Sequence, residues 1–152
     1  MINKMYFTLP REYREAAPDD LKKIIRSVKK ARGDRLLILT HHYQRMEIVE
    51  QGDAVGDSFG LSKIASQSNA EHIVFCGVHF MAEAAYILSN GNQKVYLPNP
   101  LAGCPMADMA EMADVLETWK VLEKFGGDKK IMPISYMNSA AGLNSCCGQH
   151  GG

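Results

Sequence analysis

Side chains that can do chemistry stand directly after the apolar runs of this sequence. His41 and Tyr43 follow the first of these runs, while Tyr136 ends a later one and Asn138 comes just after it. Cys104 lies between two such runs, on a loop rich in glycine and proline. Imidazole and phenol groups transfer protons in catalysis, and a thiolate is a metal ligand. Side chains of these types after successive strands predict a shared ligand-binding cleft.

Cys104 is the cysteine best suited to bind a metal. A glycine before it allows the backbone to approach a bulky group closely. One cysteine cannot hold an iron–sulfur cluster or a structural zinc, so its partners would come from elsewhere. Cys76 ends an apolar run and is expected in the core. Cys146 and Cys147 are neighbours on a short predicted helix, where adjacent side chains diverge by about 100°, and we expect structural or incidental roles for them.

Ser58 lies at the predicted start of a helix. Asp57 or Ser58 would cap that helix, and the free N–H groups behind such a cap bind carboxylate or phosphate readily. A plain cap is the simpler interpretation. In the same way, His41 and His42 could be ordinary turn residues, and Tyr43 could cover the sheet with its ring buried and its hydroxyl in water. The residues alone leave these alternatives open.

Hydrophobic periodicity predicts alternating strands and helices. The expected strands are 36–40, 72–76, 94–97 and 130–136, with Pro133 weakening the last, and the expected helices are 18–31, 58–67, 79–89 and 106–125, with glycines 33 and 126–127 ending the first and last. This alternation predicts an α/β fold, a three-layer αβα domain with a short, mostly parallel sheet. Ligands bind such sheets beyond the carboxyl ends of the strands, where the candidate residues converge.

The periodicity also predicts which side chains face inward. Those expected to be buried by the helices are Leu61, Ile64, Ala65, Phe80, Met81, Ala84, Ile87 and Leu88, and the methionines at 106, 109 and 112 are expected in a core or an interface rather than at a cofactor.

Composition narrows the class of protein. Hydrophobic residues make up 46% of the 152, enough for a core, and 17 basic residues balance 17 acidic ones. A neutral chain has no broad attraction for nucleic acid or anionic membranes, and no apolar run is long enough to cross a bilayer. The first twenty residues contain no apolar leader segment, so we expect no secretory signal and a cytoplasmic protein.

A weak internal similarity predicts the domain organisation. The segments LLILTHHYQ and KIMPISYMN are both apolar runs that end in tyrosine and an amide residue. We expect a first α/β domain with an N-terminal helix over residues 1–128. Residues 129–152 would then be the start of a second α/β domain, comprising one βα unit.

Five motifs, taken together and in this order, resemble the quinolinate synthase family. They are HHYQ from His41, GDS from Gly56, FCGVHFMAE from Phe75, AGCPMAD from Ala102 and SYMNS from Ser135. The resemblance implies three similar α/β domains around a pseudo-threefold axis, with the active site at their junction. It implies a [4Fe–4S] cluster whose fourth iron lacks a protein ligand and acts as a Lewis acid. The implied reaction condenses iminoaspartate with dihydroxyacetone phosphate to quinolinate in NAD biosynthesis, with a possible functional link to L-aspartate oxidase.

The resemblance also implies roles for individual residues. His41, Tyr43 and Tyr136 match catalytic positions. Ser58 matches the position that holds a substrate carboxylate at a helix N-terminus. His41, Tyr136 and Asn138 match further substrate contacts.

The metal ligand and the departures from the family follow from the same resemblance. Cys104 matches the cluster ligand of the first domain, and His42, where many members have tyrosine, receives no role. The second and third cluster cysteines and a catalytic glutamate lie in regions that this sequence lacks, and Cys146 and Cys147 do not match them. We therefore expect an N-terminal portion of the enzyme that alone neither binds a complete cluster nor catalyses the reaction.

Two other functions stay open at this point. One is a non-catalytic α/β module that binds dicarboxylates or phosphates with the same loops. The other is a metal-binding interaction protein in which Cys104 is shared across an oligomer interface.

Overall fold

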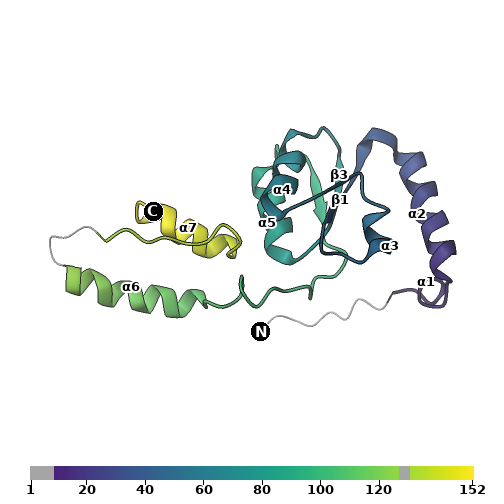
Figure 1. The fold of residues 1–152 in the computed structure, drawn as a ribbon. Helices are drawn as coiled ribbons and strands as arrows, with labels where there is room; N and C mark the ends of the chain where they lie inside the picture. The colour runs from purple at the N-terminus through teal and green to yellow at the C-terminus, as the bar shows by residue number, and fades with distance from the viewer. Residues whose placement is uncertain (1–8, 127–130) are drawn as a thin grey trace. The chain divides into compact units, whose positions relative to one another are not determined.

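The computed structural model of the chain describes residues 9–126 and 131–152 (Figure 1). Internal contacts divide the chain into two compact units, Met1–Gly33 and Asp34–Gly152, which are described separately. The predicted helix break at Gly127 and the predicted strand start at Lys130 lie outside the described residues. So does position 129, and the domain boundary predicted there stays a prediction.

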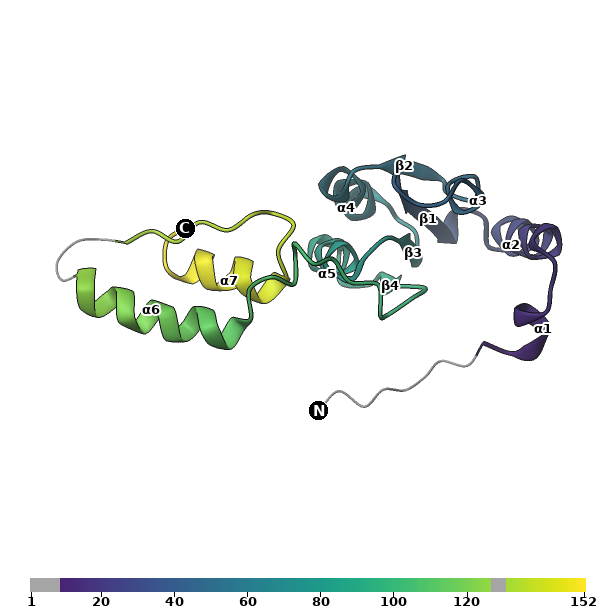
Figure 2. The ribbon, with the colours of Figure 1, turned by 60° about the horizontal axis from the view of Figure 1, so that its bottom comes forward.

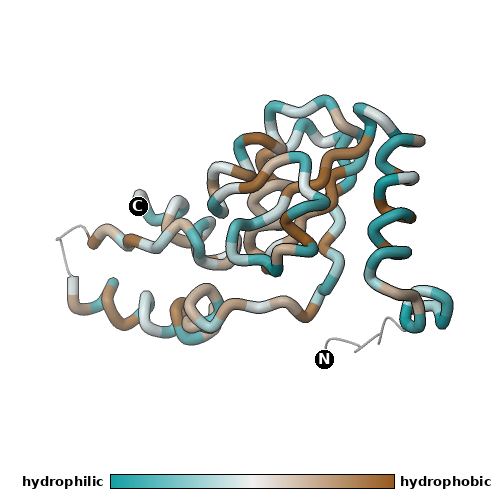
Figure 3. Tube along the Cα trace, turned by 45° about the vertical axis from the view of Figure 1, so that its right-hand side comes forward, coloured by the Kyte–Doolittle hydropathy of each residue, from teal (hydrophilic) through white to brown (hydrophobic). Residues whose placement is uncertain are grey.

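The first unit consists of α1 (Arg11–Arg14) and α2 (Pro18–Arg32). The bounds of α2 confirm the predicted helix. Proline occupies its first turn, where its missing N–H costs nothing, and two aspartates there complement the positive end of the helix dipole. Gly33 ends the helix with a φ of 54°, a backbone conformation that favours glycine. Along α2, short hydrophobic bands alternate with longer hydrophilic stretches (Figure 3).

The second unit is built on a sheet that, among the described residues, has four strands, all parallel. In spatial order they are β2 (Ala54–Gly56), β1 (Leu36–His41), β3 (His72–Cys76) and β4 (Lys94–Tyr96). The α/β class is therefore confirmed, as are the predicted strands that begin at residues 36, 72 and 94. The sheet is parallel throughout, since each described connection is a crossover.

Among the described residues, the helices that contact this sheet are α3 (Met46–Val49), α4 (Ser58–Gln67) and α5 (His79–Leu88). Two further helices, α6 (Met112–Gly126) and α7 (Ala141–Gln149), follow β4 along the chain, and α7 contacts α5. A 3₁₀ turn, Gly33–Arg35, precedes β1. Figure 2 shows α4 and α5 side by side on one face of the sheet and α3 on the other. Among the described residues, no helix is both long and apolar enough to cross a bilayer.

The core lies between the sheet and the pair α4–α5. Leu39, Ile73 and Phe75 from the strands and Leu61 from α4 are fully buried there. The second half of β1 is buried on both faces, as is typical of a continuous apolar run in a parallel sheet. Ala107, from the loop before α6, also belongs to this core, which ties that loop to the end of the sheet.

Strand β2 was not predicted, because three residues give no usable periodicity. Its position depends on Asp53, which pairs with Ile38 on β1 twice. The backbone N–H of Asp53 donates to the Ile38 carbonyl at 2.7 Å, and its carboxylate accepts the Ile38 N–H at 2.8 Å. The carboxylate thus serves as one rung of the ladder.

The predicted strand at 130–136 is wrong for its described part, since residues 131–136 are not in a strand. Proline at 133 has no N–H to donate to a neighbouring strand. The predicted helix at 106–125 begins only at Met112, after a series of turns. Two of the methionines expected in a core or interface, Met106 and Met109, are exposed in these turns.

Part of the predicted burial is also wrong. Leu61, Ala65, Phe80 and Met81 are buried as expected. By contrast, Ile64, Ile87 and Leu88 are exposed, because the faces of α4 and α5 that carry them point away from the sheet among the described residues.

The topology determines where a ligand would bind. The chain leaves β1 toward β2 through α3 and leaves β3 toward β4 through α5, so neighbouring strands send their connections in opposite directions. Such a reversal opens a crevice at the carboxyl ends of the two strands. Thr40 and Cys76 are register partners, so the loops after β1 and β3 begin level with each other.

A core substitution tests this packing. Leu39→Ala should lower the free energy of unfolding by about 2–5 kcal/mol, because it leaves a cavity between the sheet and α4. Leu101→Ala, at a largely exposed leucine, should change it by less than about 0.5 kcal/mol. Urea unfolding monitored by circular dichroism measures both. Equal losses would contradict the assignment of the core.

Candidate functional site

His41 is the centre of the candidate site. It is the last residue of β1 and only 6% exposed. Its Nδ1 accepts the backbone N–H of Tyr43 at 3.4 Å, and its Nε2 lies 3.3 Å from the hydroxyl oxygen of Ser58. Because Nδ1 accepts, the neutral ring carries its proton on Nε2 and donates it to Ser58. The imidazole is thereby held in one orientation and one tautomer.

Ser58 is the first residue of α4, as the sequence predicted. Asp57 caps the helix, with its carboxylate accepting the N–H of Gly60 at 2.8 Å, and this hydrogen bond lowers the pKa of Asp57. The buried Ser58 hydroxyl therefore lies at the positive end of a ten-residue helix, next to the imidazole.

Tyr43 and Cys104 lie at the same rim of the sheet. The Tyr43 ring packs on His41, with 4.0 Å between the ring centroids, and its side chain is half exposed. Burial raises the pKa of Tyr43, and the charge of Cys104 raises it further. The Cys104 loop reaches this end of the sheet, because Ala102 accepts the N–H of His79 just after β3 and Cys104 packs against the core. The structure thus brings together the candidates at 41, 43, 58 and 104.

Of the two remaining candidates, Asn138 lies next to the residues described above, and Tyr136 is linked to them through Asn138. Asn138 and Ser58 both line a very small cavity of about 10 Å³, and the Asn138 amide donates to the Tyr136 hydroxyl at 3.4 Å. Tyr136 is 61% exposed. Asn144 on α7 stabilises their loop, because it accepts a hydrogen bond from Ser135 at 2.7 Å and donates to the carbonyls of residues 137 and 139.

His42 has a structural role. Its backbone N–H and its ring Nδ1 both lie 3.1 Å from the carbonyl of Gly56 on β2. The two contacts close the end of the β1–β2 ladder beneath the candidate site. The sequence analysis gave His42 no catalytic role. In the structure, its contacts with Gly56 belong to the sheet.

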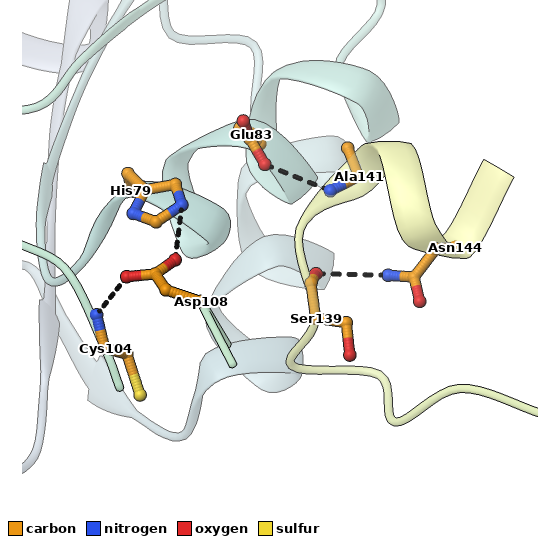
Figure 4. A network of polar contacts seen from close by, with 7 residues as sticks. All are labelled: His79, Glu83, Cys104, Asp108, Ser139, Ala141 and Asn144. Carbon is orange, nitrogen blue, oxygen red and sulfur yellow. Dashed lines mark hydrogen bonds and ion pairs between the residues drawn. The ribbon is translucent and has the colours of Figure 1, made fainter. Parts of the chain in front are cut away.

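Three polar residues around the site were missed by the sequence analysis (Figure 4). Asp108 accepts the Cys104 N–H at 3.0 Å and lies 3.3 Å from the His79 ring, while Glu83 accepts the N–H of Ala141 at the start of α7. The only hint in the sequence was that Asp108 lies within the motif AGCPMAD and Glu83 within FCGVHFMAE.

The remaining cysteines do not join Cys104. All four cysteines are free thiols. Cys76 is half-buried beside Thr40 at the end of β3, and burial raises its pKa, while Cys146 and Cys147 lie on α7. Within the described residues, no three histidine, cysteine, aspartate or glutamate side chains are grouped closely enough to hold a metal ion.

Comparison with known proteins decides the family. Residues 23–150 match the family described as quinolinate synthetase A protein. The chain belongs to this family. It is 50% identical over 145 residues to the quinolinate synthase of Corynebacterium glutamicum, covering 95% of this chain and 37% of that protein. It is 46% identical over 144 residues to that of Streptomyces coelicolor, covering 94% and 36%.

The chain spans about two fifths of the length of the curated relatives that it matches. Over 152 residues it is 45% identical to the quinolinate synthase of a Geobacillus strain, which is 99% of this chain and 41% of that relative. The resemblance inferred from the five motifs is therefore confirmed at the level of the family.

The described residues of the chain fit an iron–sulfur cluster only as the source of one ligand. Cys104 offers a partly exposed thiol whose backbone N–H and carbonyl are both bonded to Asp108. Clusters of this type need several thiolates. The fit therefore requires ligands from outside the described residues.

A larger cavity of about 430 Å³ adjoins the small one, with Phe59 and Phe80 lining both, and it suits an anionic ligand poorly. Its lining is mainly apolar, with Phe59, Phe80, Ile87 and Leu88 among its residues, and it includes none of His41, Tyr43 and Cys104. A substrate with carboxylate or phosphate groups would lose hydration there without gaining partners. The candidate site is therefore the polar rim at the end of β1.

The pKa of His41 gives a pH-dependent test. Burial lowers this pKa below the ordinary value of 6.5, and the charge of His42 lowers it further, while Asp57 offsets part of the shift. The neutral ring then stabilises the fold fully above pH 6.5, and that contribution is lost as the pH falls through the lowered folded-state pKa. His41→Gln should lose less stability than the wild type between about pH 7 and about pH 5.

Urea unfolding across this pH range measures the difference, and an NMR titration of the imidazole gives the pKa directly. A His41 pKa at or above 6.5 would contradict the buried, neutral state described above.

Proposed function

We propose that this chain forms the N-terminal portion of a quinolinate synthase, which condenses iminoaspartate with dihydroxyacetone phosphate to quinolinate. One observation carries the proposal: in a member of this family, the imidazole of His41, the hydroxyls of Tyr43 and Ser58 and the thiol of Cys104 share one rim of the sheet. These groups match the needs of a reaction between small anionic substrates that requires several proton transfers.

Cys104 would bind one iron of a [4Fe–4S] cluster. Because such a cluster needs several thiolates, its other ligands would come from other domains. When bound, the cluster supplies an iron with an open position that polarises a hydroxyl or carbonyl oxygen.

Ser58 would hold a substrate carboxylate. The N–H groups at the start of α4 carry a partial positive charge, and the Ser58 hydroxyl can donate because it already accepts the proton of His41 Nε2. A carboxylate there would accept hydrogen bonds from groups that are already oriented. Asn138, beside Ser58 in the small cavity, would add an amide donor.

His41, Tyr43 and Tyr136 would transfer protons. The lowered pKa keeps His41 neutral near pH 7, so its ring can act as a general base and take up a proton that a substrate carbon or nitrogen releases. The raised pKa keeps the Tyr43 phenol protonated, so it can act as a donor. Tyr136, exposed and hydrogen-bonded to Asn138, would contact substrate from the second domain.

Iminoaspartate would come from an enzyme that oxidises aspartate, which gives the functional link to L-aspartate oxidase its chemical reason. The small-molecule substrates and the cytoplasmic location both stay predictions.

A chimera tests the proposal. In it, this chain replaces the 145 aligned residues of the Corynebacterium glutamicum quinolinate synthase. After anaerobic reconstitution, the chimera should bind about four irons and form quinolinate. Cys104→Ser should abolish both, because it removes a ligand. Cys76→Ser should keep iron bound and mainly lower stability, because Cys76 is packed beside Thr40.

Iron and sulfide analysis, the visible spectrum and quinolinate formation are the measurements. If Cys76→Ser lost the cluster and Cys104→Ser kept it, the ligand assignment would be wrong. A folded chimera that binds a dicarboxylate but loads no iron would instead support the non-catalytic binding module.

A matched serine pair on α4 tests carboxylate binding. In the chimera, Ser58→Ala should raise the KM for iminoaspartate roughly tenfold, because a hydrogen bond to a charged group is lost. Ser66→Ala should leave KM unchanged, since the Ser66 hydroxyl donates only to the carbonyl of Lys63 on the exposed side of the helix. Equal KM values for the two variants would count against a carboxylate at Ser58.

A further inference from the structure

We propose that Asp108 is a positioning residue for Cys104, holding the thiol loop in the geometry in which it receives iron. The inference rests on the proposed role of Cys104 as a ligand, and it concerns a residue to which neither the motifs nor the comparisons gave a role. Figure 4 shows the Asp108 carboxylate between the Cys104 backbone and the ring of His79.

Asp108 and Cys104 bond to each other twice. The Cys104 N–H donates to Asp108 Oδ2 at 3.0 Å, and the Asp108 N–H donates to the Cys104 carbonyl at 2.9 Å. Both backbone groups of the cysteine are thus committed to one residue. The sulfur is then the remaining atom of Cys104 that can bind a metal, and it is partly exposed.

His79 connects this pair to the end of the sheet. As the first residue of α5, just after β3, it donates its backbone N–H to the Ala102 carbonyl at 3.0 Å, and its ring Nε2 lies 3.3 Å from Asp108 Oδ1. One residue therefore fixes the loop on both sides of Cys104. Each Asp108 oxygen has its own donor, so the carboxylate cannot rotate without breaking a bond.

Apolar packing against the core holds the same loop in place. Ala107, next to Asp108, is 2% exposed, and Cys104 packs against the core cluster. Gly103 makes room for the carboxylate, because a Cβ at that position would lie 2.8 Å from Asp108 Oδ2. The motif AGCPMAD thus has a physical explanation. Gly103 leaves room for the carboxylate, Ala107 packs in the core, and Asp108 orients Cys104.

Ligands that are oriented before metal binding retain metal better than ligands that must be ordered by it, and loss of an outer partner typically lowers metal affinity by about 10–100-fold. Asp108 acts through Cys104 and need not touch the metal or the substrate.

Amide hydrogen exchange on this chain tests the positioning without any cluster. In Asp108→Ala, the Cys104 amide should exchange roughly tenfold faster, because its acceptor is gone. Asp108→Asn should retain most of the protection, since its amide oxygen can still accept. Asp114→Asn, at an exposed aspartate on α6, is the control and should leave the Cys104 amide unchanged.

The chimera tests the consequence for the metal. Iron should pass to a chelator roughly tenfold faster in Asp108→Ala than in the parent, and Asp108→Asn should restore most of the retention. If the Cys104 amide loses protection in Asp108→Ala while iron retention is unchanged, the positioning role is overturned but the proposed function stands. If Cys104→Ser itself retains the cluster, the proposed function fails instead. Unchanged exchange in Asp108→Ala would also overturn the inference.

Discussion

The buried carboxyl end of β1 is the constraint on which the candidate site depends. His41 is paired with β2 in the ladder and held by Ser58 at the start of α4, so its ring has little freedom. Its neighbour Thr40 is level with Cys76 on β3, and this register places the turn after β1 beside the turn that starts α5. Helix α5 then holds the Cys104 loop through His79. The site is therefore an outcome of strand register, and the loops carry chemistry because the sheet fixes where each begins.

Much of this arrangement could be predicted from the sequence, because it depends on local signals. The run Leu36–Thr40 predicted a strand, and Asp57 with Ser58 predicted the start of α4. Topology then predicted that residues after successive parallel strands would converge. By contrast, β2 was missed because it depends on one carboxylate, that of Asp53, replacing a rung of the ladder. The expected strand at 130–136 failed in its described part because apolar composition alone cannot show which partner a segment pairs with.

The polar contacts that hold the site together were also invisible in the sequence. Nothing in a linear pattern indicates that Asp108 contacts His79, 29 positions earlier, since that contact depends on how α5 follows β3. The same applies to Glu83 and Ala141. Burial on the outer faces of α4 and α5 was overestimated for a related reason. Periodicity identifies an apolar stripe, but Ile87 and Leu88 lack a covering partner within the described residues.

The central claim is spatial: iron bound through Cys104 lies on the same rim as Tyr43 and Ser58. An anomalous difference map at the iron K-edge, from crystals of the reconstituted chimera, tests it most directly. The account predicts iron density at the Cys104 sulfur, on the side of the sheet where the Tyr43 and Ser58 hydroxyls lie. Iron density bound to Cys76 or to the cysteines of α7, with none at Cys104, would contradict it.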